Sequence, residues 1–446
     1  MDVTSGEPKN IAIIGGGFTG LTAAYTLAKK GHHVTVFEAE AILGGLVAGF
    51  DIDGVPLEKA YHFLYKTDNH IIDMAKELGI ADTLTFHASS TGLAYGGILY
   101  PFMTPMDLIR FKPLSFVNRI RAGLVVLYLS KATKWQKFAD VTAIEWMRKW
   151  GGEEVTRIIW EPVLRGKFFD YYDKIAMSYV WGRVAVRANS KDKGDVTEKL
   201  GYFAGGFRTF TDALVRACTQ RGVKFVLNTK PSAVIQGNDS ATIVYNGTEQ
   251  TFDAVLATTP SHVFRHLIEN AKNTVSPAFL EKLTSIEYLG AILMVFTTDK
   301  KFTDYYWHNV NDLGQPFLVL LSLSALIGTE PLKGKNVYYI GSYVPHDHKY
   351  YSMSDDEIKE LWVGGIKNIF PDFDESTITA SHIFKFKNAQ HIVEPGYAAK
   401  IPPYQSELPN VFLANYTQIF PEDRGTNYAV AEGVKVAELI DQKLQK

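Results

Sequence analysis

A glycine-rich turn between an apolar strand and a helix is the feature that most constrains this chain. Residues 10–14 form an uncharged run typical of a buried strand, and Gly15, Gly17 and Gly20 follow it in G-x-G-x-x-G spacing. Gly15 permits a tight turn, Gly17 lets the backbone approach a pyrophosphate, and Gly20 lets the next helix pack closely on the strand. The spacing therefore predicts a dinucleotide-binding α/β unit.

The residues that follow the glycines complete this prediction. Phe18 and Thr19 begin the predicted helix, where unpaired N–H groups and the positive end of the helix dipole attract a phosphate. A second predicted strand, residues 33–37, ends at Glu38, which stands where an acid accepts hydrogen bonds from ribose hydroxyls. Strand, glycines, helix, strand and acid thus occur in the order that a dinucleotide site requires.

The composition is that of an ordinary globular protein and excludes several classes. The chain has 446 residues, 46% of them hydrophobic, and a formal net charge of −2. This length predicts two or three domains, and the charge balance gives no sign of a nucleic-acid partner. A single cysteine, Cys218, can form neither an internal disulfide nor a zinc–thiolate or iron–sulfur site. We expect a cytoplasmic protein without a metal, and the oligomeric state stays open.

Three uncharged runs raise the question of a membrane contact. Residues 10–28 are interrupted by glycines, and the strand and helix above explain them. Residues 122–129 predict a core helix and residues 317–327 predict a buried strand. The alternative for these two runs is a lipophilic substrate channel or a shallow membrane contact. No other run approaches the roughly 20 apolar residues of a bilayer span, so we expect no transmembrane segment.

A double glycine after Glu38 adds a family resemblance. Residues 38–50 read EAEAILGGLVAGF, in which Gly44 and Gly45 follow the acid. This pattern resembles the flavin-containing amine oxidase superfamily, which includes protoporphyrinogen oxidases, phytoene desaturases and, more distantly, UDP-galactopyranose mutases. The resemblance implies FAD as the dinucleotide. Leu46 stands where the family often has an arginine, so no role of that arginine is carried over.

Three later segments resemble the same superfamily, at residues 200–235, 252–267 and 410–440. The resemblance places the backbone of Val234 against the adenine. It places Asn415 near the ribitol and phosphate, where the family usually has an aspartate. It also implies that the helix beginning at Thr426 and Asn427 points its N-terminus at the flavin pyrimidine. No cysteine lies in the third segment, so FAD is expected to bind non-covalently.

These segments bracket regions that match poorly, which predicts one domain interrupted by another. The predicted fold class is α/β, or α+β overall, with a Rossmann-like FAD-binding domain and a substrate domain of mixed sheet and helices. We expect the FAD-binding domain at residues 1–85, 200–265 and 388–446. We expect the substrate-binding domain at residues 86–199 and 266–387.

Three residues are candidates for the substrate site. His62 lies in residues 57–69, which resemble the segment of UDP-galactopyranose mutases that holds a histidine near the flavin; a structural histidine is the alternative. His391 lies in residues 385–398, which resemble the flavin-side segment of protoporphyrinogen oxidases and amine oxidases. Arg424 can bond the flavin or an anionic substrate with its planar fork, or it neutralises its acidic neighbours.

A second set of cations lies among aromatic residues. Arg165, Lys167, Arg183 and Arg187 have tryptophan, phenylalanine or tyrosine close by in the sequence. Such a mixture can hold a phosphorylated or carboxylated substrate, and scattered solvated charges are the alternative.

The resemblance implies an FAD-dependent oxidoreductase that passes a hydride equivalent from a small organic substrate to flavin N5. Amine oxidation, porphyrinogen oxidation and desaturation all fit, and the substrate is expected to be lipophilic or a nucleotide-sugar. The alternative is a redox-neutral mutase that uses reduced flavin on a nucleotide-sugar, which the segment around His62 favours. A flavin-binding scaffold without activity is the third hypothesis.

Overall fold

A five-stranded parallel sheet forms around the glycine-rich turn. The computed structural model describes residues 7–190, 197–271 and 273–445. The strands, in the order β19-β13-β1-β2-β9, come from distant parts of the chain. They are β1 (Asn10–Ile14), β2 (His33–Phe37), β9 (Lys224–Val226), β13 (Ala254–Ala257) and β19 (Val411–Leu413). Because β1 is central, the turn after it lies at the carboxyl edge of the sheet, where open α/β sheets bind their ligands.

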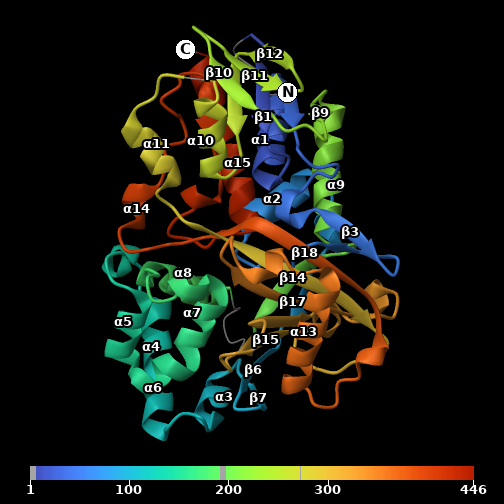
Figure 1. Cartoon of the computed structure of the whole chain (residues 1–446), viewed down its shortest axis with the longest axis vertical. Coiled ribbons are helices and arrows are strands. Elements are labelled where there is room, and N and C mark those ends of the chain that lie inside the picture. Colours follow the sequence, from blue (N-terminus) through green and yellow to red (C-terminus); the bar gives the residue numbers. More distant parts are fainter. Residues whose placement is uncertain (1–6, 191–196, 272, 446) are drawn as a thin grey trace.

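Alternate residues of β1 enter two hydrophobic cores. Ile11 and Ile13 face a core closed by three helices, whereas Ala12 and Ile14 face a core closed by a small antiparallel sheet and two helices. The helices of the first core are α1 (Phe18–Lys29), α9 (Phe207–Gln220) and α15 (Thr426–Leu444). The second core is closed by β10 (Ala233–Gln236), β11 (Ala241–Tyr245), β12 (Thr248–Phe252), α10 (Ser261–Glu269) and α11 (Pro277–Thr284). Figure 1 shows this unit in its upper half.

The C-terminal helix α15 packs directly on α1. A Cβ atom on Gly433 would lie 2.6 Å from the carbonyl oxygen of Thr19 and 2.7 Å from Cβ of Thr22. The two helices therefore touch backbone to backbone, which a larger residue at position 433 would prevent. This contact joins the two ends of the chain beside the glycine-rich turn.

A seven-stranded mixed sheet forms the second layer. Its order is β18-β14-β17-β16-β15-β6-β7. The strands are β6 (Thr91–Tyr95), β7 (Ile98–Pro101), β14 (Tyr288–Thr298), β15 (Trp307–Val310), β16 (Val319–Ser322), β17 (Asn336–Val344) and β18 (Ile378–His391). Met294 and Ile340 pack with α13 (Asp355–Ile369) on one face, while Val295 and Tyr339 belong to the core around α1. The sheet is thus fixed between α13 and the parallel α/β unit.

A group of helices lies beside this sheet, at the lower left of Figure 1. Its members are α3 (Pro105–Arg110), α4 (Phe116–Lys131), α5 (Ala143–Gly151), α6 (Glu153–Val155), α7 (Glu161–Phe168) and α8 (Met177–Asn189). They have a core of their own, in which Leu129, Met147, Phe168 and Met177 are fully buried. Tyr397 enters the same core from the segment after β18, so the helical group is anchored to the long sheet.

The remaining elements connect these layers. They are β3 (Gly49–Ile52), β4 (Val55–Glu58), α2 (Asn69–Glu77), β5 (Leu84–Ala88), β8 (Lys199–Phe203), α12 (Leu323–Ile327) and α14 (Tyr397–Lys400). The predicted fold class, a Rossmann-like unit with a mixed sheet and helices inserted, is confirmed. The domain boundaries stay a prediction.

Two local predictions need correction. The predicted buried strand at 317–327 is right for β16 and wrong beyond it, because the Ser322 side chain accepts a hydrogen bond from the N–H of Ala325 and begins α12. The run 122–129 is helical as predicted, but it is not a core helix on all sides, since Leu124 is 60% exposed. Among the described residues, no helix combines the length and the apolar character that crossing a bilayer requires.

We predict that Gly433→Ala lowers the free energy of unfolding by about 1–3 kcal/mol, because the new methyl group forces α15 away from α1. Gly364→Ala is the matched control. That glycine also lies inside a helix, but a Cβ there would meet no atom within 4 Å, so the change should stabilise by about 0.5–1 kcal/mol. Chemical denaturation measures both. An equal change in the free energy of unfolding of the two variants would contradict the close packing of α15 on α1.

Candidate active site

The turn after β1 forms a cradle of backbone groups. Gly15 has a φ of +113°, and a Cβ on Gly20 would lie 2.0 Å from the carbonyl oxygen of Gly15, so α1 starts tight against the turn. A Cβ on Gly17, by contrast, would meet no atom within 4 Å. Helix α1 begins at Gly17 without a side-chain cap. The first N–H groups of the helix are therefore left for a ligand, as a diphosphate site requires.

The double glycine lies against this cradle. The N–H of Gly44 donates to the carbonyl oxygen of Gly16 over 2.8 Å, and Gly17 and Gly44 form an isolated parallel bridge. A Cβ on Gly45 would lie 3.2 Å from Cα of Gly17. The two glycine motifs, separate in the sequence, thus build one wall around the same space.

Glu38 stands at the end of β2 beside the turn. One carboxylate oxygen accepts the N–H of Gly16 over 2.7 Å, and the other accepts the N–H of Glu40 over 2.9 Å. These bonds fix the carboxylate at the edge of the cradle. Each oxygen keeps a further lone pair with which it can accept a ribose hydroxyl.

The other predicted cofactor residues occupy different places. Val234 is fully buried in β10, and its carbonyl oxygen accepts a hydrogen bond from Nδ2 of Asn273. Thr426 begins α15, whose N-cap residue Gly425 supplies no side-chain cap. The side-chain oxygen of Asn427 accepts the N–H of Ile71 over 3.2 Å, so this amide joins α15 to α2. The contacts of these residues with the cofactor stay predictions.

Asn415 is held entirely by the protein. Its Oδ1 accepts hydrogen bonds from the N–H and the hydroxyl of Thr417, at 3.0 and 2.7 Å. Its Nδ2 donates to the carbonyl oxygen of Thr259 over 2.9 Å and to the hydroxyl of Ser261 over 3.2 Å. Asn415 therefore ties the turn after β19 to the turn after β13, and its contact with the cofactor stays a prediction.

A small cavity of about 50 Å³ lies where the α/β unit meets the long sheet. It is lined by Leu46, Ala60, Tyr61, His62, Ala291, Leu293, Gly341, Ser342, Tyr343, Phe386, Ala389 and Arg424. Most of these side chains are apolar, with a few polar groups among them, which is typical of a small-molecule site. Leu46 follows the double glycine, so the cavity adjoins the cofactor cradle.

His62 lines this cavity as a neutral imidazole. Its Nδ1 lies 2.7 Å from the carbonyl oxygen of Ala60, which fixes Nδ1 as the protonated nitrogen. Burial lowers the pKa of His62 to about 4, and the charge of Arg424 lowers the pKa further in the same direction. At neutral pH, Nε2 is therefore a hydrogen-bond acceptor.

His391 is buried without a hydrogen-bond partner on either ring nitrogen. Its ring stacks on Tyr416 at 5.4 Å and lies 5.5 Å from the ring of Tyr397. The hydroxyl of Tyr416 and the side-chain oxygen of Asn388 are also buried without partners. Unpaired buried polar atoms are rare, so this group fits a polar ring ligand such as a flavin. Burial also lowers the pKa of His391 to about 3, which keeps the imidazole neutral.

Arg424 connects the cavity to the long sheet. Its Nε donates to the side-chain oxygen of Gln390 over 2.9 Å, and its guanidinium also donates to the hydroxyl of Tyr343 over 3.2 Å. The guanidinium lies over the rings of Tyr343 and Tyr416 at about 6 Å. These contacts hold the cation at the cavity wall, and they do not pair it with a carboxylate.

The carboxylate next to it is paired with two other cations. Asp423 accepts a hydrogen bond from Lys167 over 3.1 Å and a shorter one from Arg183, while its second oxygen is buried without a partner. Two cations thus bind this carboxylate, and the charge of Arg424 also acts on it. Burial lowers the pKa of Lys167 to about 7, and the charge of Arg183 adds to this effect. The cluster carries a local excess of positive charge.

The sequence analysis found some of these residues and missed others. It named Lys167 and Arg183 in one set with Arg165 and Arg187, and Arg424 by itself. In the structure Lys167 and Arg183 bind Asp423, on which the charge of Arg424 also acts. It missed Tyr343, which lies inside the apolar strand β17 and has no local signal. Arg165, in contrast, pairs with Glu161 outside this cluster.

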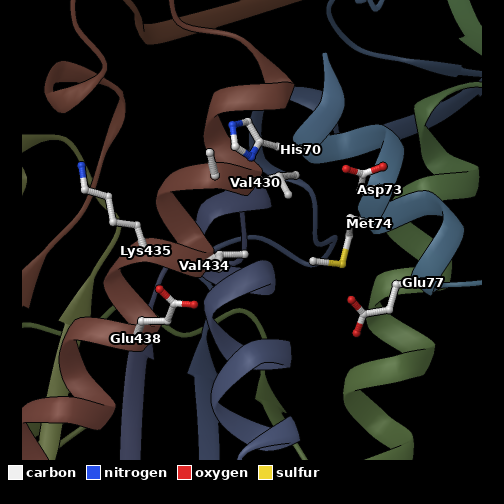
Figure 2. Close-up of a pocket in the computed structure, with 9 residues that line it drawn as sticks. His70, Asp73, Met74, Glu77, Val430, Val434, Lys435 and Glu438 are labelled. Atoms are coloured by element: carbon white, nitrogen blue, oxygen red, sulfur yellow. The ribbon is translucent and has the colours of Figure 1, made fainter. Parts of the chain in front are cut away.

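A surface pocket lies elsewhere, between α2 and α15 (Figure 2). Its walls carry charges of both signs, including Asp73, Glu77, Lys435 and Glu438. Glu77 is already engaged by the hydroxyl of Tyr25 and the ammonium group of Lys29. Within the part of the chain that the structure describes, no group of His, Cys, Asp and Glu is arranged to hold a metal. The pocket therefore offers less chemistry than the cavity at His62.

A comparison with protein families shows to which family this chain belongs. Residues 18–440 match the family described as flavin containing amine oxidoreductase. The chain belongs to this family. The flavin cofactor and the oxidoreductase class that the family resemblance led us to expect are therefore confirmed.

The individual proteins to which this chain is similar are named as enzymes of different kinds. The chain is 28% identical to coproporphyrinogen III oxidase of Staphylococcus aureus, over 57% of this chain and 61% of that protein. It is 25% identical to mitochondrial protoporphyrinogen oxidase of Nicotiana tabacum, over 67% of this chain and 66% of that protein. The matches thus span less than two thirds of both relatives. A phytoene desaturase of Glycine max is 23% identical over 92% of this chain and 76% of that protein.

Solved structures confirm the fold. Cyclohexylamine oxidase from Brevibacterium oxydans superimposes with a TM-score of 0.73 at 15% identity, covering 99% of this chain and 100% of that chain. An oxidoreductase from Methanosarcina mazei gives a TM-score of 0.74 at 15% identity, covering 96% of this chain and 100% of that chain.

We predict that Gly17→Asp yields a folded protein that does not retain flavin. The φ of Gly17 is −76° and its Cβ position is open, so the fold accepts a side chain there, whereas the new carboxylate would occupy and repel the diphosphate site. Flavin absorbance of the purified protein and its circular dichroism measure the two properties. Gly364→Asp, on the exposed surface of α13, is the control and should purify with flavin. Full flavin occupancy in Gly17→Asp would place the cofactor elsewhere.

Proposed function

We propose that this chain is an FAD-dependent enzyme that oxidises an organic substrate bound in the cavity at His62 and Arg424. The observation that carries this proposal is the position of the cavity. It lies between two segments of the α/β unit and the long sheet. Leu46 comes from the segment after the double glycine and His62 from the segment after β4, while the long sheet contributes Leu293 and Tyr343. A substrate in this cavity would therefore lie next to a flavin that the cradle would hold.

The residues that would hold FAD follow from the geometry of the cradle. The turn at Gly15 and Gly17 and the start of α1 would bind the diphosphate, and Glu38 would bind the ribose. The flavin ring of FAD would bind at the unpaired polar atoms around His391 and at the N-terminus of α15. Bound FAD supplies the acceptor for a hydride equivalent.

The side chains of the cavity have separate roles. Neutral His62 offers Nε2 to a substrate N–H or O–H, and its low pKa makes it a weak base that positions more than it deprotonates. Tyr343 and Arg424 hold each other and can orient a polar substrate group. Leu46, Leu293 and Phe386 exclude water from the reacting atoms.

The names of the relatives favour oxidation over the mutase alternative. The relatives above are named as oxidases, a desaturase and an oxidoreductase, and they lend no support to a nucleotide-sugar mutase. The proposed domains are those of the sequence analysis, with FAD bound to residues 1–85, 200–265 and 388–446. A cytoplasmic location is proposed with them.

The proposal is tested by anaerobic mixing of the flavin-loaded enzyme with one compound of each class: a carboxylated porphyrinogen, an alkyl amine and an apolar polyene. We predict that one of them bleaches the flavin absorbance without another reductant. UDP-galactose is the control for the mutase alternative. If no compound bleaches the flavin, and UDP-galactose is isomerised only after reduction with dithionite, the proposed oxidation is wrong.

The cation cluster supports a finer proposal, a substrate with an anionic group. Lys167 and Arg183 bind a single carboxylate, Asp423, in a partly buried setting, and the charge of Arg424 acts on the same carboxylate. Excess charge of one sign in a place of low dielectric is costly unless a counter-ion binds. A carboxylate or phosphate on the substrate would supply that charge and accept hydrogen bonds from the two cations on the helical group.

We predict that the KM of such a carboxylated substrate rises by up to about tenfold per pH unit above pH 7, because Lys167, with its pKa of about 7, loses its charge. His62 and His391 are neutral throughout this range, and Asp423 stays ionised because the cations lower its pKa. Lys167→Arg should abolish the rise, since arginine stays protonated. Steady-state kinetics measure KM. The same pH profile in Lys167→Arg would contradict the proposed contact.

A further inference from the structure

Helix α7, which carries Lys167, continues from a turn that is not α-helical. The residues Thr156–Trp160 form a π-helix, which lies directly between α6 and α7. A π-turn contains one residue more than an α-turn, so the side chains after it are rotated by about 100° relative to those of a continuous α-helix. The direction in which Lys167 points therefore depends on this turn.

A proline and an asparagine account for the π-turn. In an α-helix, the carbonyl oxygen of Ile158 would accept the N–H of residue 162, but Pro162 has no N–H and its ring displaces that carbonyl. Nδ2 of Asn311 donates to this oxygen over 2.8 Å, and it also donates over 3.5 Å to the carbonyl oxygen of Ile159. The asparagine side chain thus replaces the missing helical hydrogen bond.

Asn311 belongs to the long sheet and is itself fixed in place. It follows β15, it is only 2% exposed, and its backbone N–H donates over 2.9 Å to the carbonyl oxygen of Ala94 in β6. A buried carbonyl group without a donor is costly, so the hydrogen bonds from this side chain favour the opened turn over a closed α-turn. The long sheet therefore stabilises the π-turn of the helical group.

The other end of α7 also packs against the sheet. A Cβ on Gly166 would lie 3.1 Å from Cβ of Leu318, so the helix touches the segment before β16. Phe169, which follows α7, has a φ of +51° and packs into both the core of the helical group and the core around α13. A residue other than glycine keeps such a φ only where its surroundings fix it. Lys167 therefore lies on a helix whose rotation is fixed from both ends.

We propose that Asn311 is a positioning residue, which sets the rotation of α7 and so holds the ammonium group of Lys167 on Asp423. Asn311 acts through the backbone of the helix, since its side chain bonds the carbonyl groups of the π-turn. The charged and titratable groups around the ammonium come from α8, from β18 and from the segment before α15: Arg183, Tyr179, His391, Asp423 and Arg424. The role of this contact in catalysis rests on the proposed anionic substrate, because Lys167 is one of the cations that would bind it.

Chemical labelling of Lys167 in the flavin-loaded enzyme tests the positioning without a substrate. The probe is a trace of N-hydroxysuccinimidyl acetate, which acylates only the unprotonated amine, and mass spectrometry follows the labelling rate of Lys167 against pH. We expect the rate to reach half its plateau near pH 7 in the unchanged chain, because burial and the charge of Arg183 lower the pKa of Lys167 to about 7. In Asn311→Leu this half-point should rise by at least about one pH unit, because Lys167 leaves the cluster and regains water.

Asn410→Leu is the matched control. Nδ2 of Asn410 also donates over 2.8 Å to a backbone carbonyl oxygen, that of Asp253, and both residues precede strands of the parallel sheet, at the edge opposite the glycine-rich turn. This variant should lower the midpoint of chemical denaturation and leave the half-point of Lys167 as it is in the unchanged chain. An equal shift of the half-point in both variants, or no shift in Asn311→Leu, overturns the proposal.

A double variant separates positioning from a loss of stability, and it is the test if the single variant does not fold. Asn311→Leu leaves the carbonyl group of Ile158 without a donor, whereas Asn311→Leu/Pro162→Ala returns a backbone N–H to residue 162 and closes an α-turn. The double variant should regain the denaturation midpoint and flavin content of the unchanged chain but keep the raised half-point, because Lys167 is still turned away. Recovery of the half-point as well would show that Asn311 only stabilises the fold, and would overturn the proposal.

The KM of the carboxylated substrate separates this proposal from the one on which it rests. At about pH 6.5 we expect Asn311→Leu to raise KM about tenfold with little change in kcat, since the charge that would bind the carboxylate has moved. A raised half-point with an unchanged KM would confirm that Asn311 positions Lys167 and would contradict the contact of Lys167 with the substrate. An unchanged half-point overturns the positioning whatever the value of KM.

Discussion

The site depends on backbone contacts that only glycine permits. Gly44 and Gly45 lie against Gly17, and Gly433 lies against the backbone of α1. The first contact closes the diphosphate cradle, and the second brings the start of α15 to the same edge of the sheet. Both contacts involve main chain and require the absence of a side chain, and the hydrogen bond from Gly44 to Gly16 adds to the first. This edge of the sheet therefore positions the cavity, the cation cluster around Asp423 and the expected binding site of the flavin ring.

Burial then sets the electrostatics of the cavity. It keeps His62 and His391 neutral, so neither histidine is the source of positive charge near neutral pH. The charge comes instead from Arg424 and from the two cations that pair with Asp423. Apolar walls strengthen these charges relative to water, which is how a small number of groups can select an anionic substrate. Orientation and charge are thus the contributions of the protein, while the flavin supplies the redox chemistry.

The sequence predicts the parts of the fold whose chemistry is local. The glycine spacing and Glu38 specify the dinucleotide unit, because each residue acts through its own backbone or its immediate neighbour. The meeting of Lys167 with Asp423 could not be predicted, since 256 positions separate them and only the packing of the helical group on the start of α15 joins them. For residues 122–129 the sequence predicts a core helix, with a substrate channel or a shallow membrane contact as the alternative, and the exposed side of α4 could not be predicted for another reason. An apolar run shows that a helix has apolar faces, but not whether the chain has an element to cover each of them.

The central claim is that the cradle holds FAD without a covalent bond, and acid precipitation of the purified protein tests it most directly. The measurement is the amount of FAD in the supernatant relative to the amount of chain. The account predicts about one equivalent of FAD per chain in solution and a colourless precipitate. Flavin that stays with the precipitated protein, or a purified chain that neither carries FAD nor binds it when FAD is added, would contradict the account.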